Sequence, residues 1–129
     1  MQLSLKIIDL NGVYFQGEVD LVNLTIASGN VTILANHIPL ISSIDISHMY
    51  VKINGEQINY AIAGGTLFVS EKECKIITTA IEKADEIDFD RALSAKNRTL
   101  EYLNSKNDNI DYKRAEVALK KAINRLSFK

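Results

Sequence analysis

The stretch Glu82–Ala92, EKADEIDFDRA, separates two parts of the chain that have different hydrophobic periods. Before it, short runs rich in Val, Ile, Leu and Thr alternate with turn signals, and Asn54-Gly55 lies between two such runs. These are the signals of short strands and of a two-residue hairpin. After it, apolar residues recur at spacings of three and four without any Gly or Pro, which is typical of helices. The sequence therefore predicts a β domain over residues 1–84 and a helical hairpin over residues 85–129.

The β part carries turn signals at short, regular spacing. They are Asn11-Gly12, Ser28-Gly29-Asn30, Asn54-Gly55, Gly64-Gly65 and Glu71-Lys72. Many short strands with frequent turns indicate an antiparallel sandwich or a flattened barrel. The single proline, Pro39, cannot donate a ladder hydrogen bond, so it predicts an edge or a corner of the sheet.

The helical part reads as two amphipathic segments joined by the polar loop NSKNDN at residues 104–109. The apolar faces are Leu93, Leu100 and Leu103 in the first segment, and Ala115, Leu119, Ala122 and Leu126 in the second. Alanines also dominate the expected contact faces: Ala92, Ala95, Ala115, Ala118 and Ala122. Because each buried methyl group contributes only about 0.8 kcal/mol, we expect the hairpin to need a further surface or ligand for stability.

The pattern Ile-Asp-x-x-Arg-Ala occurs twice, at Ile87–Ala92 and at Ile110–Ala115. In both copies the aspartate precedes the first helical residue, where a carboxylate accepts the unpaired N–H groups of the first turn. The isoleucine and the alanine then form a small hydrophobic staple. Capping does not explain Arg91 and Arg114, since a cation at a helix N-terminus opposes the helix dipole.

Basic residues form a stripe on one side of each helical segment. Arg91 and Arg98 share a side of the first segment, and Arg114, Lys121 and Arg125 share a side of the second. If the helices pack by their apolar faces, the two stripes can converge on one rim, where arginine would bind a phosphate chain. The alternative is a solvated basic face with acidic neighbours, and periodicity alone favours that alternative.

The charge, the N-terminal stretch, and the single cysteine and two histidines argue against several classes of protein and of site. The net charge of −1 argues against a general nucleic-acid binder, and the N-terminal stretch shows neither a secretory signal nor a membrane span. The single cysteine, Cys74, lies in an alternating apolar stretch and is expected to be a packed strand residue in a reducing compartment. His37 and His48 lack neighbours at metal-ligand spacing, so we predict no metal site and no catalytic set. His37 is expected to fix its loop or to lie at an interface.

Four stretches resemble the epsilon subunit of bacterial F-type ATP synthases. They are GNVTILANHIPLI at residues 29–41, AIAGGTLFVSEKECKII at 61–77, EKADEIDFDRA at 82–92 and DNIDYKRAEVALKKAINRLS at 108–127. The resemblance implies a ten-stranded N-terminal β-sandwich followed by a two-helix antiparallel hairpin. It also implies a non-catalytic subunit that needs no cofactor and lies peripherally at the cytoplasmic face of the cell membrane, through the complex alone.

The same resemblance implies partners and site residues. The sandwich would bind the gamma subunit and the c-ring, and the extended hairpin would reach the catalytic beta subunits and inhibit ATP hydrolysis. The folded hairpin would bind ATP as a regulatory ligand through Glu82, Ile87, Asp88, Arg91, Ala92, Arg98, Lys121 and Arg125. Lys121 stands where ATP-binding relatives often have arginine. The loop at Asn36, His37, Pro39 and Leu40 would meet the rotor.

Two other functions remain open at this stage. One is a free-standing ATP-binding sensor, in which the sandwich only supports the helical pocket. The other is a carbohydrate-binding sandwich, which is disfavoured because the chain has no Trp and its aromatic residues are scattered.

Overall fold

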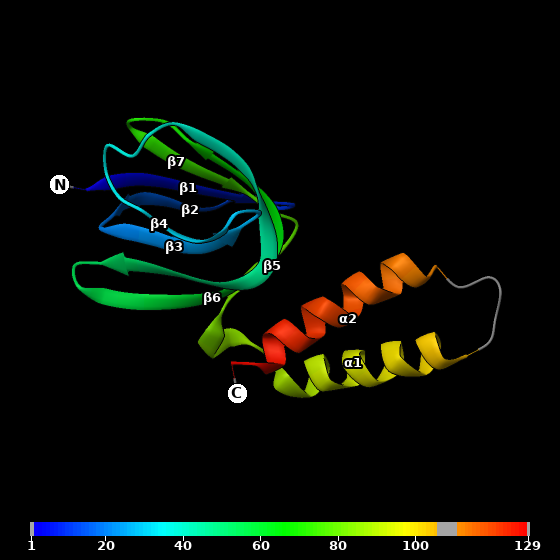
Figure 1. The fold of residues 1–129 in the computed structure, drawn as a ribbon. Coiled ribbons are helices and arrows are strands. Elements are labelled where there is room, and N and C mark those ends of the chain that lie inside the picture. Colours follow the sequence, from blue (N-terminus) through cyan, green and yellow to red (C-terminus); the bar gives the residue numbers. More distant parts are fainter. Residues whose placement is uncertain (1, 106–110, 129) are drawn as a thin grey trace. The chain divides into compact units, whose positions relative to one another are not determined.

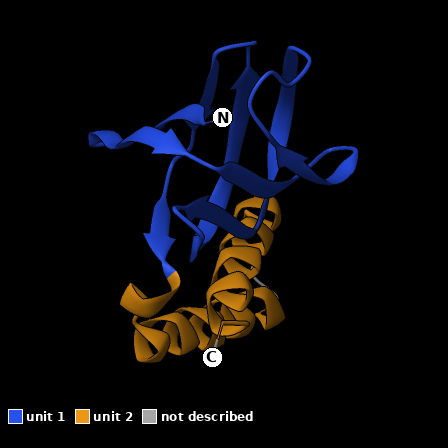
Figure 2. Cartoon of the chain, turned by 90° about the vertical axis from the view of Figure 1, so that its left-hand side faces the viewer, with its two compact units in different colours: residues 1–83 blue, residues 84–129 orange. Residues whose placement is uncertain are grey.

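The fold is described by a computed structural model, which covers residues 2–105 and 111–128. The chain divides into two compact units, residues 1–83 and 84–129, which are coloured separately in Figure 2. The strands of the first unit are β1 (Leu3–Asp9), β2 (Gly12–Val19), β3 (Leu21–Ile26), β4 (Gly29–Ile33), β5 (Leu40–Ile53), β6 (Glu56–Val69), β7 (Glu73–Ile77) and β8 (Ile81–Lys83). The second unit begins with a 3-10 turn, η1 (Ala84–Glu86), and continues with α1 (Phe89–Asn104) and α2 (Tyr112–Leu126).

The strands form one sheet that folds over on itself, in the order β2-β1-β7-β6-β5-β3-β4, with β8 paired to β6. The strands β5 and β6 are 14 residues long and strongly curved, so each contributes to both layers of the sandwich (Figure 1). Strand β6 pairs with β8 through Tyr60–Ile62 and with β7 through Thr66–Val69. The described residues therefore hold eight strands rather than the ten that the resemblance implies, because β5 and β6 each continue through the bend as one strand.

The bend of β6 lies at Gly64 and Gly65, whose φ angles are 83° and 143°. The prediction of a turn at these two glycines is wrong, since both lie inside a strand. Residues with side chains rarely adopt such φ angles, so glycine permits the strand to bend here. The neighbouring Thr78 is buried, and its hydroxyl lies within hydrogen-bond distance of the carbonyl oxygens of Gly64 (2.5 Å) and Ala80 (3.1 Å). These contacts tie the bend to the segment that follows β7.

The other turn signals lie in the connections of consecutive strands or overlap the first residues of the following strand. Asn54 and Gly55 form the two-residue connection of β5 and β6, and both have positive φ angles, 51° and 83°. This is the backbone of a type I′ hairpin turn, which the Asn-Gly pair predicts. Pro39 lies immediately before β5, at the corner where the chain enters the long strand. The predictions of a hairpin at Asn54-Gly55 and of a corner at Pro39 are confirmed.

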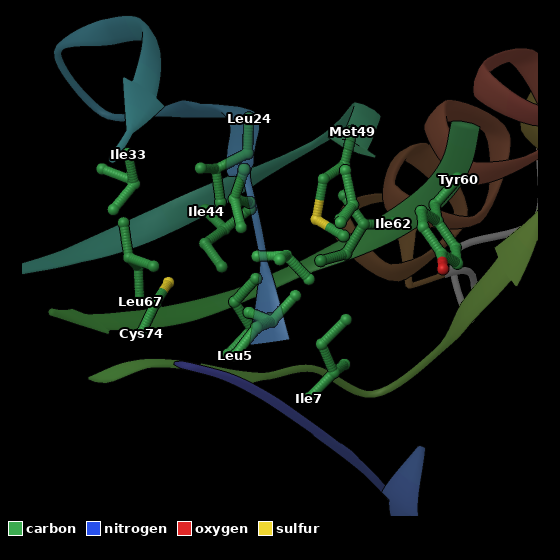
Figure 3. Close-up of a cluster of buried hydrophobic side chains, with 14 of the residues drawn as sticks. Leu5, Ile7, Leu24, Ile33, Ile44, Met49, Tyr60, Ile62, Leu67 and Cys74 are labelled. Carbon is green, nitrogen blue, oxygen red and sulfur yellow. The ribbon is translucent and has the colours of Figure 1, made fainter. Parts of the chain in front are cut away.

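The hydrophobic core lies between the two layers and draws on both (Figure 3). Its fully buried side chains include Leu5 and Ile7 of β1, Leu24 of β3, Ile62 and Leu67 of β6, and Cys74 and Ile76 of β7. Cys74 is completely buried, as the alternating pattern predicts. Burial, and secondarily the negative charge of Glu73, raises the pKa of the Cys74 thiol to about 12.

The two helices of the second unit run antiparallel (Figure 1). They pack on each other through small side chains. The buried residues of α1 and α2 are Ala92, Ala115 and Ala122. Leu93 and Leu100 are 46% and 37% exposed, so the prediction that they form the packing face of α1 is wrong. The close approach of the helices selects the alanine side of α1, which lies about 100° away from these leucines.

Two further expectations for the hairpin are revised. Ala118 is exposed rather than part of the contact between the helices. The polar loop was expected over residues 104–109, but Asn104 is the last residue of α1, and residues 106–110 lie outside the described residues.

Candidate functional site

Both helices begin at the aspartate of the repeated pattern. The Asp88 side chain accepts a hydrogen bond from the backbone N–H of Arg91 at 3.0 Å, and Asp111 accepts one from the N–H of Arg114 at 3.0 Å. The first intrahelical bonds also start at these residues, from Ala92 N–H to Asp88 and from Ala115 N–H to Asp111. The predicted N-caps are therefore confirmed in both copies.

Both apolar positions of the pattern are described in the first copy, and one of them in the second. Ile87 and Ala92 are 8% and 1% exposed, as expected for residues on either side of the cap that pack inward. Ala115 of the second copy is also buried. The other half of that staple, Ile110, lies outside the described residues.

A hollow of about 370 Å³ lies between α1 and α2. Its lining consists of Arg98, Thr99 and Tyr102 from α1, and Asp111, Arg114, Ala115 and Ala118 from α2. The hollow thus brings Arg98 of the first basic stripe together with Arg114 of the second. Among the described members of the two stripes, only this pair lines the hollow. Ala118 is exposed, and its small side chain leaves part of the hollow open that a larger side chain would occupy.

Three basic residues of the predicted nucleotide site lie outside the hollow, on other parts of the hairpin. Arg91 is exposed in the first turn of α1, while Lys121 and Arg125 are half-buried near the end of α2. Lys121 follows Arg114 by seven residues, and Arg125 follows Lys121 by four, so both continue the side of Arg114 along α2 toward the helix C-terminus. None of the three lines the hollow.

Glu82 is the one predicted nucleotide contact that belongs to the first unit. It is half-buried on β8, where it pairs in register with Ala61 of β6. The structure places Ile87, Asp88, Arg91 and Ala92 at the start of α1, and Arg98 in its middle.

The predicted rotor loop connects β4 to β5. Asn36 is exposed and has a φ angle of 63°, and Pro39 is also exposed. His37 donates through Nδ1 to the carbonyl oxygen of Ile38 at 2.6 Å, which agrees with a loop-fixing role. Leu40 is half-buried against the core, so it stabilises the start of β5. Leu40 is therefore a weaker candidate for a surface contact than its neighbours.

Sequence reasoning missed the most exposed apolar side chains of this region. Leu34, Ile38 and Ile41 are 52%, 79% and 72% exposed, and Phe68, at 36%, lies directly opposite Ile41 in the β5–β6 ladder. We call these four residues the loop patch. The signal was present in the sequence, because three of them fall in the run ILANHIPLI, which has more apolar residues than one buried face of a strand can use.

Other classes of site were sought among the described residues. Within residues 2–105 and 111–128, no cluster of three or more His, Cys, Asp or Glu could hold a metal ion. None of the described helices is long and apolar enough to span a membrane.

Family models match the chain along nearly its whole length. The model of the ATP synthase delta/epsilon chain beta-sandwich domain matches residues 2–84, and that of the delta/epsilon chain long alpha-helix domain matches residues 85–129. The two matches are consecutive, and together they contain every residue of the caps, the hollow and the loop patch.

Similar proteins carry the same description. The ATP synthase epsilon chain of Mycoplasmopsis pulmonis is 42% identical over 98% of this chain and 92% of its own length. That of Bacillus pumilus is 37% identical over 97% of this chain and 95% of its own length.

Solved structures share the fold at low sequence identity. A chain of the Euglena gracilis mitochondrial ATP synthase has a TM-score of 0.79 at 20% identity, over 92% of this chain and 76% of its own length. A chain of the Tetrahymena thermophila mitochondrial ATP synthase has a TM-score of 0.64 at 9% identity, over 99% of this chain and 93% of its own length. On the family models and the sequence identities, the chain belongs to the ATP synthase delta/epsilon family, with the bacterial epsilon chains.

Proposed function

We propose that this chain is the epsilon subunit of the central stalk of an F-type ATP synthase, where it couples the c-ring to the catalytic head. One observation carries the proposal: the sandwich and the hairpin match the two domains of the family consecutively, over residues 2–84 and 85–129. As a member of this family the chain is a non-catalytic subunit of the synthase. The synthase would hold it at the cytoplasmic face of the cell membrane.

The sandwich supplies the attachment to the rotor, with the gamma subunit and the c-ring as partners. The loop patch supports this role, because three of its four side chains are more than half exposed. Three of the four are close together in the sequence, and Ile41 pairs with Phe68 in the ladder, and exposed apolar side chains in such proximity are typical of a protein–protein contact. Asn36, His37 and Pro39 border the patch and shape the loop that presents it.

The hairpin supplies regulation: in an extended state it reaches the catalytic beta subunits and inhibits ATP hydrolysis. The packing of α1 on α2 supports such a moving part, since the buried residues of the two helices are alanines. At about 0.8 kcal/mol for each buried methyl group, this contact stabilises the folded hairpin weakly. A ligand that binds only the folded form would shift the population away from the inhibitory form.

ATP is the ligand that the hairpin would take when folded, bound through Ile87, Asp88, Arg91 and Ala92 of the first copy of the pattern. Glu82, Arg98, Lys121 and Arg125 complete the proposed set. The proposed set draws basic residues from both α1 and α2, and such residues suit a triphosphate, because guanidinium groups bind phosphate oxygens in pairs.

Reconstitution tests the proposed function. The full chain, added to a synthase complex depleted of its epsilon subunit, is expected to restore coupled ATP synthesis and to lower ATP hydrolysis. A chain that ends at residue 84 should restore coupling without lowering hydrolysis. If neither chain associates with the complex, the subunit assignment is wrong and a free-standing ATP sensor becomes the better explanation.

Two variants test the attachment surface in the same assay. Ile38→Asp places a charge in the loop patch and should weaken association with the rotor at least tenfold. Leu10→Asp is the matched control, because Leu10 is 80% exposed but lies in the turn between β1 and β2. Equal association of the two variants would remove the loop patch from the proposed interface.

A further inference from the structure

The turn between β5 and β6 is tied to the turn between β2 and β3 by an aspartate that lies far away in the sequence. Asp20, the single residue between β2 and β3, accepts a hydrogen bond through Oδ2 from the backbone N–H of Gly55 at 3.1 Å. Its own backbone N–H donates to the carbonyl oxygen of Lys52 at 2.7 Å. Asn-Gly adopts a two-residue turn readily by itself. The backbone of the turn therefore does not require the carboxylate.

Asn54-Gly55 has the chemistry of a deamidation site. The side-chain amide carbon of an asparagine can be attacked by the backbone nitrogen of the next residue, which closes a five-membered ring. Glycine at the second position hinders this attack least, because it has no side chain. Both residues are exposed, and a β-carbon at Gly55 would meet no atom within 4 Å. The turn therefore offers room for the ring and access for water.

The reaction at Asn54 exchanges one amide bond for another and then takes up water. The nitrogen of Gly55 loses its proton and bonds to Cγ of Asn54, while the bond from Cγ to Nδ2 breaks. Nδ2 leaves as ammonia, with the released proton passed to it through water. A water molecule then adds to either carbonyl carbon of the resulting succinimide and breaks the bond of that carbon to the Gly55 nitrogen. The products are aspartate and isoaspartate.

The carboxylate of Asp20 opposes this reaction in two ways. The attacking species is the deprotonated nitrogen of Gly55, and a carboxylate at hydrogen-bond distance disfavours a second negative charge there. The hydrogen bond also directs the Gly55 N–H toward Oδ2 of Asp20, whereas the ring closes only when that nitrogen turns toward Cγ of Asn54. The reaction therefore proceeds from an opened turn, whose population depends on the strength of this bond.

We propose that Asn54 is a deamidation site and that Asp20 holds the Asn54-Gly55 turn in an unreactive form. Conversion to aspartate adds a second carboxylate to the turn that Asp20 contacts. Conversion to isoaspartate lengthens the main chain by one methylene group, which does not fit a two-residue connection between the paired residues Ile53 and Glu56. Either product loosens the tip of the β5–β6 hairpin. This chemistry does not depend on the assignment of the chain as a subunit.

Incubation of the full chain in mildly alkaline buffer, followed by peptide mass spectrometry, measures the loss of each asparagine amide. Asp20→Ala should speed the loss at Asn54 at least about fivefold, because a hydrogen bond to a charged group is stronger than a neutral one. Asp20→Asn keeps an acceptor and removes the charge, so its rate should be intermediate. Asp45→Ala is the matched control: it removes an exposed carboxylate of β5 and should leave the rate unchanged.

A second Asn-Gly pair in the same chain gives an internal reference. Asn11-Gly12 is also exposed, and a β-carbon at Gly12 would also meet no atom within 4 Å. The carboxylate of Asp9 accepts the backbone N–H of Asn11 at 2.8 Å, which is not the nitrogen that closes the ring. Substitution of Asp20 should therefore change the rate at Asn54 and not the rate at Asn11. A variant that fails to fold would change both, and circular dichroism checks the folding of each variant.

Unfolding in urea completes the test. In the unfolded chain Asp20 no longer meets Gly55, so the parent and the variants should lose the Asn54 amide at one rate, faster than in the folded parent. A folded parent in which Asn54 reacts as fast as in urea would overturn the proposal, since the turn then gives no protection. Equal rates at Asn54 in folded parent and folded Asp20→Ala would overturn it too. A slower reaction in Asp20→Ala would overturn it by showing that the carboxylate promotes the attack.

Discussion

Gly65 approaches the backbone of Ile77 so closely that a β-carbon at residue 65 would overlap the carbonyl oxygen of Ile77. The φ angle of Gly65 is 143°, so an added side chain would meet both a strained backbone and a fixed oxygen atom. This contact lies at the bend of β6, where the sheet folds over to form its second layer.

Gly65→Ala should therefore destabilise the sandwich strongly, by more than about 3 kcal/mol, because strain and overlap add. Urea unfolding followed by circular dichroism measures the loss. Gly55→Ala is the matched control: its φ angle is 83°, but a β-carbon there meets no atom within 4 Å. It should cost about 1 to 2 kcal/mol through backbone strain alone. Equal losses in the two variants would show that the overlap with Ile77 is relieved by a small shift.

Thr78 is a buried polar residue of the sandwich, and its hydroxyl lies close to the carbonyl oxygens of Gly64 and Ala80. Thr78→Val keeps the shape and removes the donor, so we expect a loss of about 1 to 3 kcal/mol in the free energy of unfolding. Thr79→Val is the control, since Thr79 is exposed and should change stability little. A neutral Thr78→Val would indicate that the two carbonyl groups are satisfied without the hydroxyl.

The caps at Asp88 and Asp111 are equivalent in geometry and should be similar in energy. Replacement of either by Ala should cost about 1 kcal/mol of helix stability, whereas replacement by Asn should cost much less, because Asn is also a good cap. Thermal melts followed by circular dichroism at 222 nm measure both pairs of variants.

The Asn variant also isolates the ligand role proposed for Asp88. Asp88→Asn keeps the cap and removes the charge, so a fall in ATP affinity without a fall in helix stability would identify a direct contact with the nucleotide. Asp111→Asn should leave ATP affinity unchanged if only the first copy of the pattern contacts the nucleotide.

Cys74 reports on the opening of the core, because it is the single cysteine and is completely buried. With its pKa raised to about 12, the thiol stays protonated at pH 8 and should react with Ellman's reagent only when the sandwich unfolds. The thiol of the native protein should therefore be modified no faster than the sandwich unfolds. Rapid reaction at a rate that rises linearly with reagent concentration would contradict the packing of β7.

The same group makes stability depend on pH. The pKa of Cys74 lies above its ordinary value of 9.0 in the folded state, so its contribution to stability is complete below pH 9 and is lost as the pH rises toward 12. The measurement is the difference in the free energy of unfolding between the parent and Cys74→Ala, because contributions common to both proteins cancel in it. That difference should shrink between pH 9 and pH 11.

Lys121→Arg should raise the affinity for ATP by about tenfold, because arginine replaces one charged hydrogen bond to phosphate with a paired fork. Lys121 is half-buried near the end of α2, on the side of the helix that also carries Arg125. Titration calorimetry compares the variant with the parent, and Lys120→Arg is the control because Lys120 is exposed. An equal gain from both substitutions would show that the effect arises from general charge and not from a contact with the nucleotide.

Local chemistry alone determined several features of this chain. The change from strand to helix near residue 85, the hairpin turn at Asn54-Gly55 and the caps at Asp88 and Asp111 depend on residues that are neighbours in the sequence. These features depend on interactions within fewer than about ten residues: the period of apolar side chains, the turn propensity of Asn-Gly, and the hydrogen bonds of the first helical turn. They can therefore be predicted from the sequence alone.

Tertiary structure decided the features that depend on residues far apart in the chain. Gly64-Gly65 reads as a turn in the sequence but is the bend of a continuous strand, because the pairing of β6 with β5 and β7 holds the chain extended on both sides. The packing face of α1 lies at Ala92 and not at Leu93, since the close approach of α2 favours small side chains. Arg98 and Arg114 share a hollow only because two antiparallel helices place residues that are 16 positions apart on facing walls. The sequence supplied the charges, and the packing of one helix on the other set their distance.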